Sequence, residues 1–171
     1  MLKRAELAEC PETGRNNYYA VTLHKQDTIY ATGGVVNNRI SSQTYSFDLH
    51  SESWREEPPL NVARSKHSSC CTGLKACVLC GDGNYGYGLN SVEFLDLTVA
   101  RESEKYKWTL LELAQTSFDA RLLPLVCGIS SSNILLMGGE RRRDAHVIDV
   151  AAATSREVKK DCGGFKFGCM S

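Results

Sequence analysis

One pattern constrains the fold of this chain more than any other. An apolar run ends in glycine and is followed, after a polar stretch, by an apolar–Asp–apolar triplet. The runs are IYATGG at 29–34, CVLCGD at 77–82 and ILLMGG at 134–139. The triplets are FDL at 47–49, LDL at 95–97 and IDV at 148–150. Because the pattern recurs three times in the same order, it predicts a repeat architecture in which each copy is one supersecondary unit.

The copies are spaced 48 residues apart from Gly33 to Gly81 and 57 from Gly81 to Gly138, with the charged insert VARESEKY lengthening the second interval. Their apolar segments are short, rich in Val, Ile, Leu, Tyr and Phe, and separated by Gly, Asn and Ser, which is typical of strands. We therefore expect four strands per copy. The expected strands are 18–23, 28–34, 43–49 and 53–57, then 69–73, 76–81, 91–97 and 107–113, then 124–129, 133–138, 144–150 and 155–160.

The ordered residues of the copies resemble the kelch repeat family. The first copy carries Gly33, Gly34, Tyr45, Asp48, Trp54, Pro58, Pro59, Arg64 and His67. The second keeps Gly81, Asp96, Trp108 and Arg121, with Asp82 where the second glycine is expected. The third keeps Gly138, Gly139 and Asp149 and lacks the tryptophan. The resemblance covers nearly the whole chain and implies an all-β fold of kelch-like β-propeller blades, each a four-stranded antiparallel sheet.

Most of these residues have a structural reason to recur. Glycine pairs permit a sharp strand exit and close backbone approach, Asp suits the turn that starts a hairpin, and tryptophan can bury its face between blades. We interpret residues 1–15 as the outer strand and exit bend of a preceding blade. Residues 16–67, 68–121 and 122–161 are then three blades, the last of them degenerate, and 162–171 a tail.

About three blades are too few for closure, because propellers close with about 4–8 blades. An open stack leaves apolar faces and strand edges at both ends. Three explanations remain open: a fragment of a longer kelch protein, which we favour, a half-propeller that forms a homodimer, or a ring completed by another chain.

Composition narrows the range of partners. Lys and Arg together number 20, as do Asp and Glu, so the formal net charge is zero and no overall field attracts nucleic acid or an acidic membrane. No stretch is long and apolar enough to span a bilayer, and Glu6 and Glu9 interrupt any signal-peptide core. Eight cysteines fall short of a disulfide-scaffold composition. We therefore expect a cytoplasmic protein that binds neither nucleic acid nor membrane and uses no cofactor.

Candidate catalytic and metal-binding groups do not assemble into a motif. Cys77 and Cys80 have the spacing of a zinc knuckle, but we align them with Ile29 and Thr32 of the first copy, inside a strand. Residues three apart on a strand point to opposite faces, so we interpret both as small buried apolar residues. The four histidines show no metal or general-base spacing, and no nucleophile elbow, P-loop or dinucleotide fingerprint occurs. We expect no catalysis and no metal.

What remains is a binding surface. In kelch propellers, the loops after the second strand of each blade and the blade-joining segments commonly form the partner-binding face, and the resemblance places residues 35–42, 83–90 and 140–144 there. The candidate partner-binding residues are Asn38, Arg39, Arg64, Tyr85, Tyr87, Arg121, Arg141, Arg142 and Arg143. Arginine suits carboxylate ligands, and tyrosine is enriched at interfaces. Arg15, Arg64 and Arg121 recur at a comparable phase, so a structural role in every blade is the other interpretation of these three.

These residues favour a non-catalytic protein-interaction module that presents a loop-rich face to a protein or an acidic peptide, as an adaptor or scaffold does. The alternatives are an enzyme on a kelch-like propeller, of the oxidase or sugar epimerase type, and a self-assembling half-propeller.

Overall fold

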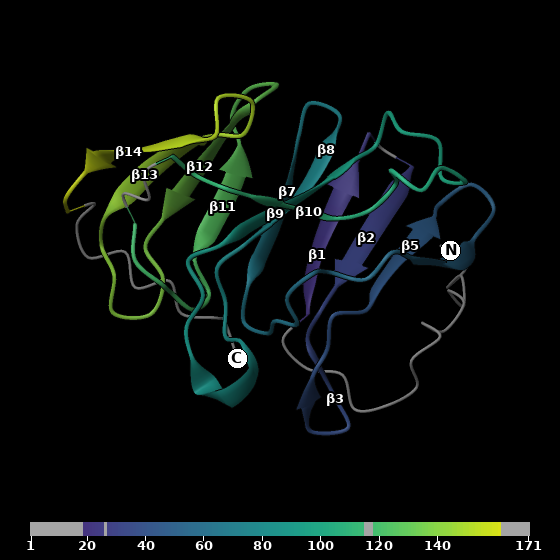
Figure 1. The fold of residues 1–171 in the computed structure, drawn as a ribbon, viewed down its shortest axis with the longest axis horizontal. Coiled ribbons are helices and arrows are strands. Elements are labelled where there is room, and N and C mark those ends of the chain that lie inside the picture. Colours follow the sequence, from purple (N-terminus) through teal and green to yellow (C-terminus); the bar gives the residue numbers. More distant parts are fainter. Residues whose placement is uncertain (1–18, 26, 115–117, 162–171) are drawn as a thin grey trace, which may run out of the picture.

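The computed structural model describes residues 19–25, 27–114 and 118–161, and it shows three four-stranded antiparallel sheets (Figure 1). The first sheet comprises β1 (Ala20–His24), β2 (Thr28–Thr32), β5 (Thr44–Asp48) and β6 (Ser53–Glu57). The second comprises β7 (Ser68–Thr72), β8 (Lys75–Leu79), β9 (Val92–Asp96) and β10 (Thr109–Leu111), and the third β11 (Leu125–Gly128), β12 (Asn133–Met137), β13 (Ala145–Asp149) and β14 (Thr154–Lys159). The predicted all-β fold with four-stranded sheets is confirmed. We call the sheets blade 1, blade 2 and blade 3.

Two small elements lie in the loops and were not predicted from the sequence. The strands β3 (Val35–Val36) and β4 (Arg39–Ile40) form a hairpin. Its two-residue turn, Asn37–Asn38, has φ of +49° and +63°, the left-handed pair that asparagine tolerates and that matches the twist of a tight hairpin. In blade 2 the corresponding loop contains the short 3₁₀ helix η1 (Asn84–Gly86). No helix among the described residues has the length and apolar character needed to cross a membrane.

The blades stack through their first strands, since β7 of blade 2 contacts both β1 and β11, as Figure 1 shows. One apolar cluster lies between blades 1 and 2 and includes Tyr30, Val78, Leu95 and Trp108. Another lies between blades 2 and 3 and consists of Cys70, Cys77, Leu79, Cys80, Val92, Phe118, Ile134, Leu136, Ile148 and Val150. The cores are therefore interfaces between sheets, so that each blade depends on its neighbour for burial.

Each blade begins its outer hairpin with the same aspartate turn. The Asp48 carboxylate accepts the backbone N–H of His50 and Ser51 at 2.9 and 2.7 Å. Asp96 and Asp149 accept equivalent amides, Thr98 at 2.9 Å and Ala151 at 2.9 Å. Hydrogen bonds donated to a carboxylate favour its charged form, and here they hold the pKa of Asp48 and Asp96 below the usual value. The predicted turn role of these two aspartates is confirmed.

The glycine pairs show that the sequence alignment of blade 2 was displaced by one residue. Gly33 and Gly34 have φ of +58° and +95°, and Gly138 and Gly139 have +56° and +112°. In blade 2 the matching angles, +61° and +98°, belong to Cys80 and Gly81. Cys80 therefore replaces the first glycine and follows the strand, and Gly81 is the second glycine rather than the first. A left-handed non-glycine residue costs about 1–2 kcal/mol.

The described residues do not close a propeller. Trp108 and Trp54 occupy the same position in their blades, beside Leu95 and Phe47 respectively. Trp108, which faces blade 1, is only 2% exposed, whereas Trp54 is half-buried and contacts Phe47 with ring centroids 5.0 Å apart. The predicted interblade burial of tryptophan therefore holds for Trp108. The predicted outer strand at 1–15 and tail at 162–171 lie outside the described residues, and the blade boundaries stay predictions.

Candidate partner-binding face

The loops that follow the second strand of each blade lie at one end of the stack, the lower end in Figure 1. We call this surface the loop face and define it as residues 35–42, 83–90 and 140–144. Backbone hydrogen bonds hold the loops firmly. Ser41 N–H donates to Gly34 O at 2.9 Å, and Leu89 N–H donates to Gly81 O at 2.7 Å. The loop face is therefore a set of anchored turns on a rigid scaffold, which is where recognition residues are expected.

The blade-joining segments attach to the base of the same loops. Ser65, which precedes blade 2, exchanges two backbone hydrogen bonds with Asp82, at 2.9 and 2.7 Å. Leu122 O, just before blade 3, accepts the N–H of Glu140 at 2.8 Å. Each loop is thus pinned to the segment that enters its own blade, so its position depends on how neighbouring blades pack.

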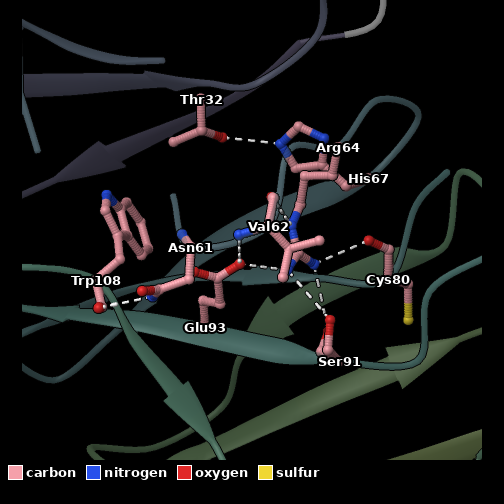
Figure 2. A network of polar contacts seen from close by, with 9 residues as sticks. All are labelled: Thr32, Asn61, Val62, Arg64, His67, Cys80, Ser91, Glu93 and Trp108. Atoms are coloured by element: carbon pink, nitrogen blue, oxygen red, sulfur yellow. Dashed lines mark hydrogen bonds and ion pairs between the residues drawn. The ribbon is translucent and has the colours of Figure 1, made fainter. Parts of the chain in front are cut away.

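A buried ion pair lies beneath the loop face at the junction of blades 1 and 2 (Figure 2). Arg64 Nη2 lies 2.5 Å from Glu93 Oε1, and neither side chain is exposed to solvent. Arg64 also donates from Nη1 to Cys80 O at 3.0 Å and from Nη2 to Ser91 Oγ at 3.2 Å. The segment leaving blade 1 is thereby fastened to blade 2.

The Glu93 carboxylate also accepts hydrogen bonds from the rest of the segment that joins blades 1 and 2. Its Oε2 accepts the backbone and side-chain N–H of Asn61 at 2.7 and 2.9 Å, and its Oε1 accepts the N–H of Val62 at 3.2 Å. Burial lowers the pKa of the Arg64 guanidinium, and the neighbouring Glu93 charge opposes that shift. The guanidinium and the carboxylate are each other's partner, the arrangement that a buried charge requires.

His67 continues this network upward in Figure 2. Its Nε2 lies 2.9 Å from Thr32 Oγ1. Burial, with Arg64 adding a smaller effect, lowers the pKa of His67 to about 3, so the ring is neutral at physiological pH. A Cβ on Gly33 would lie 2.4 Å from Arg64 O and 2.8 Å from His67 Cε1, so the glycine is needed for this close approach.

Arg121 repeats the arrangement between blades 2 and 3. Its Nη1 donates to Gly138 O at 3.1 Å, the place that Cys80 O takes for Arg64. Its Nη2 lies 3.0 Å from Asp144 Oδ2, which also lies 2.5 Å from His146 Nε2. Burial raises the pKa of Asp144, but the hydrogen bonds from His146 and Arg121 outweigh it and bring the pKa below its usual value.

These contacts correct the expectation for two of the candidate residues. Arg64 and Arg121 are 0% and 2% exposed, and each guanidinium is occupied by carbonyl and carboxylate oxygens of the next blade. They join blades, and their guanidinium groups are buried away from the surface where a partner would bind. Arg15, the third recurring arginine, lies outside the described residues.

The other candidates from blades 1 and 2 lie at loop tips. Asn38 and Arg39 are exposed at the end of the β3–β4 hairpin. Tyr87 is 73% exposed, the largest exposed fraction among the large hydrophobic side chains described. Tyr85 lies in η1, and its side chain falls outside what the structure describes. The hairpin and the tyrosine offer rigid contact points on separate blades.

The arginine triplet of blade 3 is exposed, but one member is paired. Arg142 Nη1 lies 2.8 Å from Asp119 Oδ2, so its partner is a residue of the joining segment and not Glu140 or Asp144, the neighbours in sequence. Arg141, with φ of +61°, and Arg143 are exposed and form no ion pair within the described part of the chain. Two of the three cations are therefore available for a ligand.

A shallow cleft of about 310 Å³ separates the loops of blades 2 and 3. It is lined by Asp82, Gly86, Gly88, Ala120, Arg121, Leu122, Glu140 and Arg141. Three of these, Arg121, Leu122 and Glu140, belong to the blade junction described above, so the cleft walls are the anchored parts of the loops. Tyr87 lies in the same loop as Gly86 and Gly88, and Arg141 lies on the opposite wall.

The cysteines of blade 2 are mostly buried. Cys77 and Cys80 are buried in the core between blades 2 and 3, which confirms the interpretation of both as small buried residues, and Cys70 lies in the same core. Burial raises the pKa of Cys70 and Cys80 to about 12. Across the residues that the structure describes, no three His, Cys, Asp or Glu side chains gather as a metal-binding group.

Sequence reasoning missed the acidic partners of the network. Glu93 sits in the apolar run VEFLD, and an acid in a buried strand is a signal that it has a buried cationic partner. Glu57 at the end of β6 is a second case. It is 5% exposed, accepts Ser46 Oγ at 2.6 Å and Tyr106 Oη at 3.0 Å, and lies 3.3 Å from Arg101. The insert that lengthens the second interval thus ties blade 2 to blade 1.

Comparison with protein families agrees with this geometry. The family model described as Kelch motif matches residues 17–61. Blade 1 matches the kelch repeat. The kelch match covers the four strands of blade 1, and blades 2 and 3 repeat its strand order, left-handed glycine positions and aspartate turns. No curated protein matches the chain.

Proposed function

We propose that this kelch-repeat protein is a non-catalytic interaction module whose loop face binds an acidic peptide or an acidic segment of a protein partner. The observation that carries the proposal is the pair of exposed arginines Arg141 and Arg143, which form no ion pair with any residue that the structure describes. Arg141 lines the cleft between blades 2 and 3. Tyr87, between the lining residues Gly86 and Gly88, supplies an exposed aromatic surface in the neighbouring loop.

Charge on the loop face favours an acidic ligand. Arg39, Arg141 and Arg143 are exposed without an ion pair among the described residues. Asp144 is occupied by Arg121 and His146, and Asp119 by Arg142. Glu140 is the remaining acid of the loop face, and it is exposed. Three exposed arginines outnumber it, so the surplus on the face is cationic although the chain as a whole has no net charge. Arginine forks bind carboxylates through paired hydrogen bonds.

The cytoplasmic location stays a prediction. It is supported by the free thiols of Cys70, Cys71, Cys77, Cys80 and Cys127, since cysteines remain reduced in that compartment. Adaptor or scaffold roles follow from the same proposal, because a module of this kind acts by holding a partner.

The test is selection of peptides from a random displayed library on the folded chain, followed by affinity measurement with labelled peptides. We expect enriched peptides to be acidic. Replacing Arg141, Arg142 and Arg143 with alanine should then weaken binding by about 1 kcal/mol or more, about fivefold in Kd. The loss should shrink at high salt, because salt screens exposed charges.

Arg55→Ala is the matched control, since Arg55 is an exposed arginine on β6, away from the loop face. Circular dichroism should show every variant folded. Peptides with no acidic enrichment, or equal affinity of the triple variant and the control, would remove the arginine cluster from the binding face.

A further inference from the structure

A second cleft, of about 260 Å³, lies among the first strands of the three blades, β1, β7 and β11, which lie side by side in Figure 1. It is lined by Ala20, Val21, His67, Ser68, Ser69, Pro124, Leu125 and Val126. We call it the inner-strand cleft. It shares no lining residue with the cleft between the loops of blades 2 and 3, so the two clefts are separate.

Two polar atoms of residues that line the inner-strand cleft are buried and have no hydrogen-bond partner among the described residues. They are His67 Nδ1 and Ser69 Oγ, and His67 as a whole is only 4% exposed. Burying a polar atom without a partner is unfavourable, and native proteins rarely do so. Two such atoms in the lining of one cleft therefore indicate a ligand that supplies the missing hydrogen bonds.

Both of these side chains face blade 1. His67 Nε2 lies 2.9 Å from Thr32 Oγ1 on β2. Further along β7, Cys71 Sγ lies 3.8 Å from Thr22 Oγ1 on β1. Because side chains alternate along a strand, Ser69 lies on the same side of β7 as Cys71. The two unsatisfied atoms therefore belong to the same side of the segment that enters blade 2.

The hydrogen bonds of His67 determine which of its ring nitrogens lacks a proton. Thr32 Oγ1 donates its hydrogen to Ala20 O at 3.4 Å, so toward His67 this hydroxyl acts as an acceptor. Nε2 is then the nitrogen that carries the hydrogen. Burial lowers the pKa of His67 to about 3, so the ring is neutral and Nδ1 has an unshared lone pair. The missing partner of His67 is therefore a hydrogen-bond donor.

The His67 side chain is also fixed in position. A Cβ on Gly33 would lie 2.8 Å from His67 Cε1, and a Cβ on Gly81 would lie 2.7 Å from His67 Cβ. The histidine thus packs closely against the backbone of both glycines. An acceptor that is held in place before binding reduces the entropy that a ligand must overcome.

The lining of the cleft favours an uncharged ligand. None of the eight described residues that line it is Lys, Arg, Asp or Glu, and an ionised ligand would lose hydration without gaining a counter-charge there. Val21 and Leu125 are 53% and 44% exposed and offer apolar contact. The cleft volume of about 260 Å³ is much larger than the about 30 Å³ that one water occupies. An organic molecule therefore fits better than a single water.

We propose that the inner-strand cleft binds a small uncharged alcohol. The ligand hydroxyl donates its hydrogen to His67 Nδ1 and accepts one from Ser69 Oγ, and the apolar part of the ligand packs on Val21 and Leu125. Because the cleft exists only where the three first strands lie together, the ligand stabilises the stacking of the blades. This site goes beyond peptide binding by the loop face and does not rest on it.

The test adds cyclohexanol or phenol to the full chain and records ¹⁵N NMR spectra of the histidine rings. We expect both alcohols to move the His67 Nδ1 signal in a saturable way and to raise the Tm, since a ligand that binds only the folded chain stabilises it. Cyclohexanone is similar in size to cyclohexanol but has no hydrogen to donate. It should bind about fivefold more weakly, the effect of one hydrogen bond, and leave the Nδ1 signal in place.

Two serine variants distinguish a ligand site from a structural role. Ser69→Ala removes a hydroxyl that has no partner in the described chain, so the Tm without ligand should not fall. Cyclohexanol should nevertheless bind this variant about fivefold more weakly. Ser131→Ala is the matched control, because Ser131 is exposed in the turn between β11 and β12, and its affinity for cyclohexanol should equal that of the parent. His67→Gln identifies the His67 signals, which should vanish from the spectrum.

Three results would overturn the proposal. A proton on Nδ1 in the spectrum without ligand would show that His67 needs an acceptor and not an alcohol hydroxyl. No movement of the His67 signal with either alcohol would show that water or another segment of the chain occupies the cleft. Equal binding of cyclohexanol to the parent and to Ser69→Ala would place the alcohol elsewhere. Peptide binding to the loop face is measured separately, so none of these results decides that proposal.

Discussion

Removing the charge of Glu93 should destabilise the protein strongly, because it breaks a completely buried ion pair. Glu93→Gln keeps the size of the side chain but leaves Arg64 charged and uncompensated in the interior, where both side chains are 0% exposed. It also weakens the contacts to Asn61 and Val62 that hold the blade junction. Breaking one partner of such a pair costs about 3–5 kcal/mol, a large share of the about 5–15 kcal/mol that stabilises a typical domain.

The assay is thermal and urea unfolding followed by circular dichroism. For a chain of this length, about 3–5 kcal/mol corresponds to a fall in Tm of about 6–20 °C. Glu112→Gln is the matched control, since Glu112 is exposed and surface changes stay within about 0.5 kcal/mol. The two proteins should therefore differ clearly in urea midpoint.

A double variant separates the charge from the packing. Arg64→Met combined with Glu93→Leu removes both charges and fills the space with apolar atoms, an exchange that is often neutral or stabilising. We expect the double variant to unfold at a higher urea concentration than either single variant. A loss below about 1 kcal/mol for Glu93→Gln, or strictly additive losses in the double variant, would refute the role assigned to the ion pair.

Three further predictions follow from the same junctions. Burial lowers the pKa of His67 to about 3 in the folded protein, so the unfolded chain binds a proton on this histidine first as the pH drops. Stability should therefore fall between about pH 6.5 and pH 3. The urea midpoint of the His67→Gln variant should change less between pH 7 and pH 5 than that of the parent, and an equal change in both would show that His67 is solvated in the folded protein. Gly128→Ala should destabilise the junction of blades 2 and 3 by about 2 kcal/mol or more, since its Cβ would lie 2.1 Å from Cys71 O; an unchanged Tm would contradict that contact. Asp144→Asn should cost less than Glu93→Gln, about 1–3 kcal/mol, because Asp144 is 23% exposed, and urea unfolding of the two variants side by side tests the order.

Sequence alone predicted the strands well, and the discrepancies have local causes. The expected strand 28–34 ends at Thr32 because Gly33 and Gly34 turn left-handed and leave the ladder. The expected strand 107–113 shortens to Thr109–Leu111, since Trp108 leaves the sheet ladder to fill the core between blades, where its backbone O accepts Asn61 Nδ2 at 2.8 Å. The composition of a segment indicates which residues prefer an extended backbone. It does not indicate where packing against a neighbouring sheet draws a residue out of the strand.

The one-residue error at Cys80 has a similar origin. Glycine is the residue expected at a left-handed position, so counting glycines placed Gly81 where the structure has Cys80. The backbone of Cys80 is held by Arg64 and Ser91, through 3.0 Å hydrogen bonds at its carbonyl and its N–H. Contacts with residues far along the chain, one in the segment leaving blade 1 and one before β9, stabilise a conformation that the residue itself disfavours. The residues next to Cys80 in the sequence do not indicate these contacts.

By itself, the sequence determined the repeat, the all-β class, the four strands of each blade and the aspartate turns. Each of these depends on residues close together in the chain, whose spacing and backbone preferences can be read directly. Only the tertiary structure decided which arginines face solvent. Arg64 and Arg143 look alike in sequence, yet one lies buried against Glu93 and the other is exposed. That difference depends on how one blade packs against the next, an arrangement set by contacts between residues far apart in the chain.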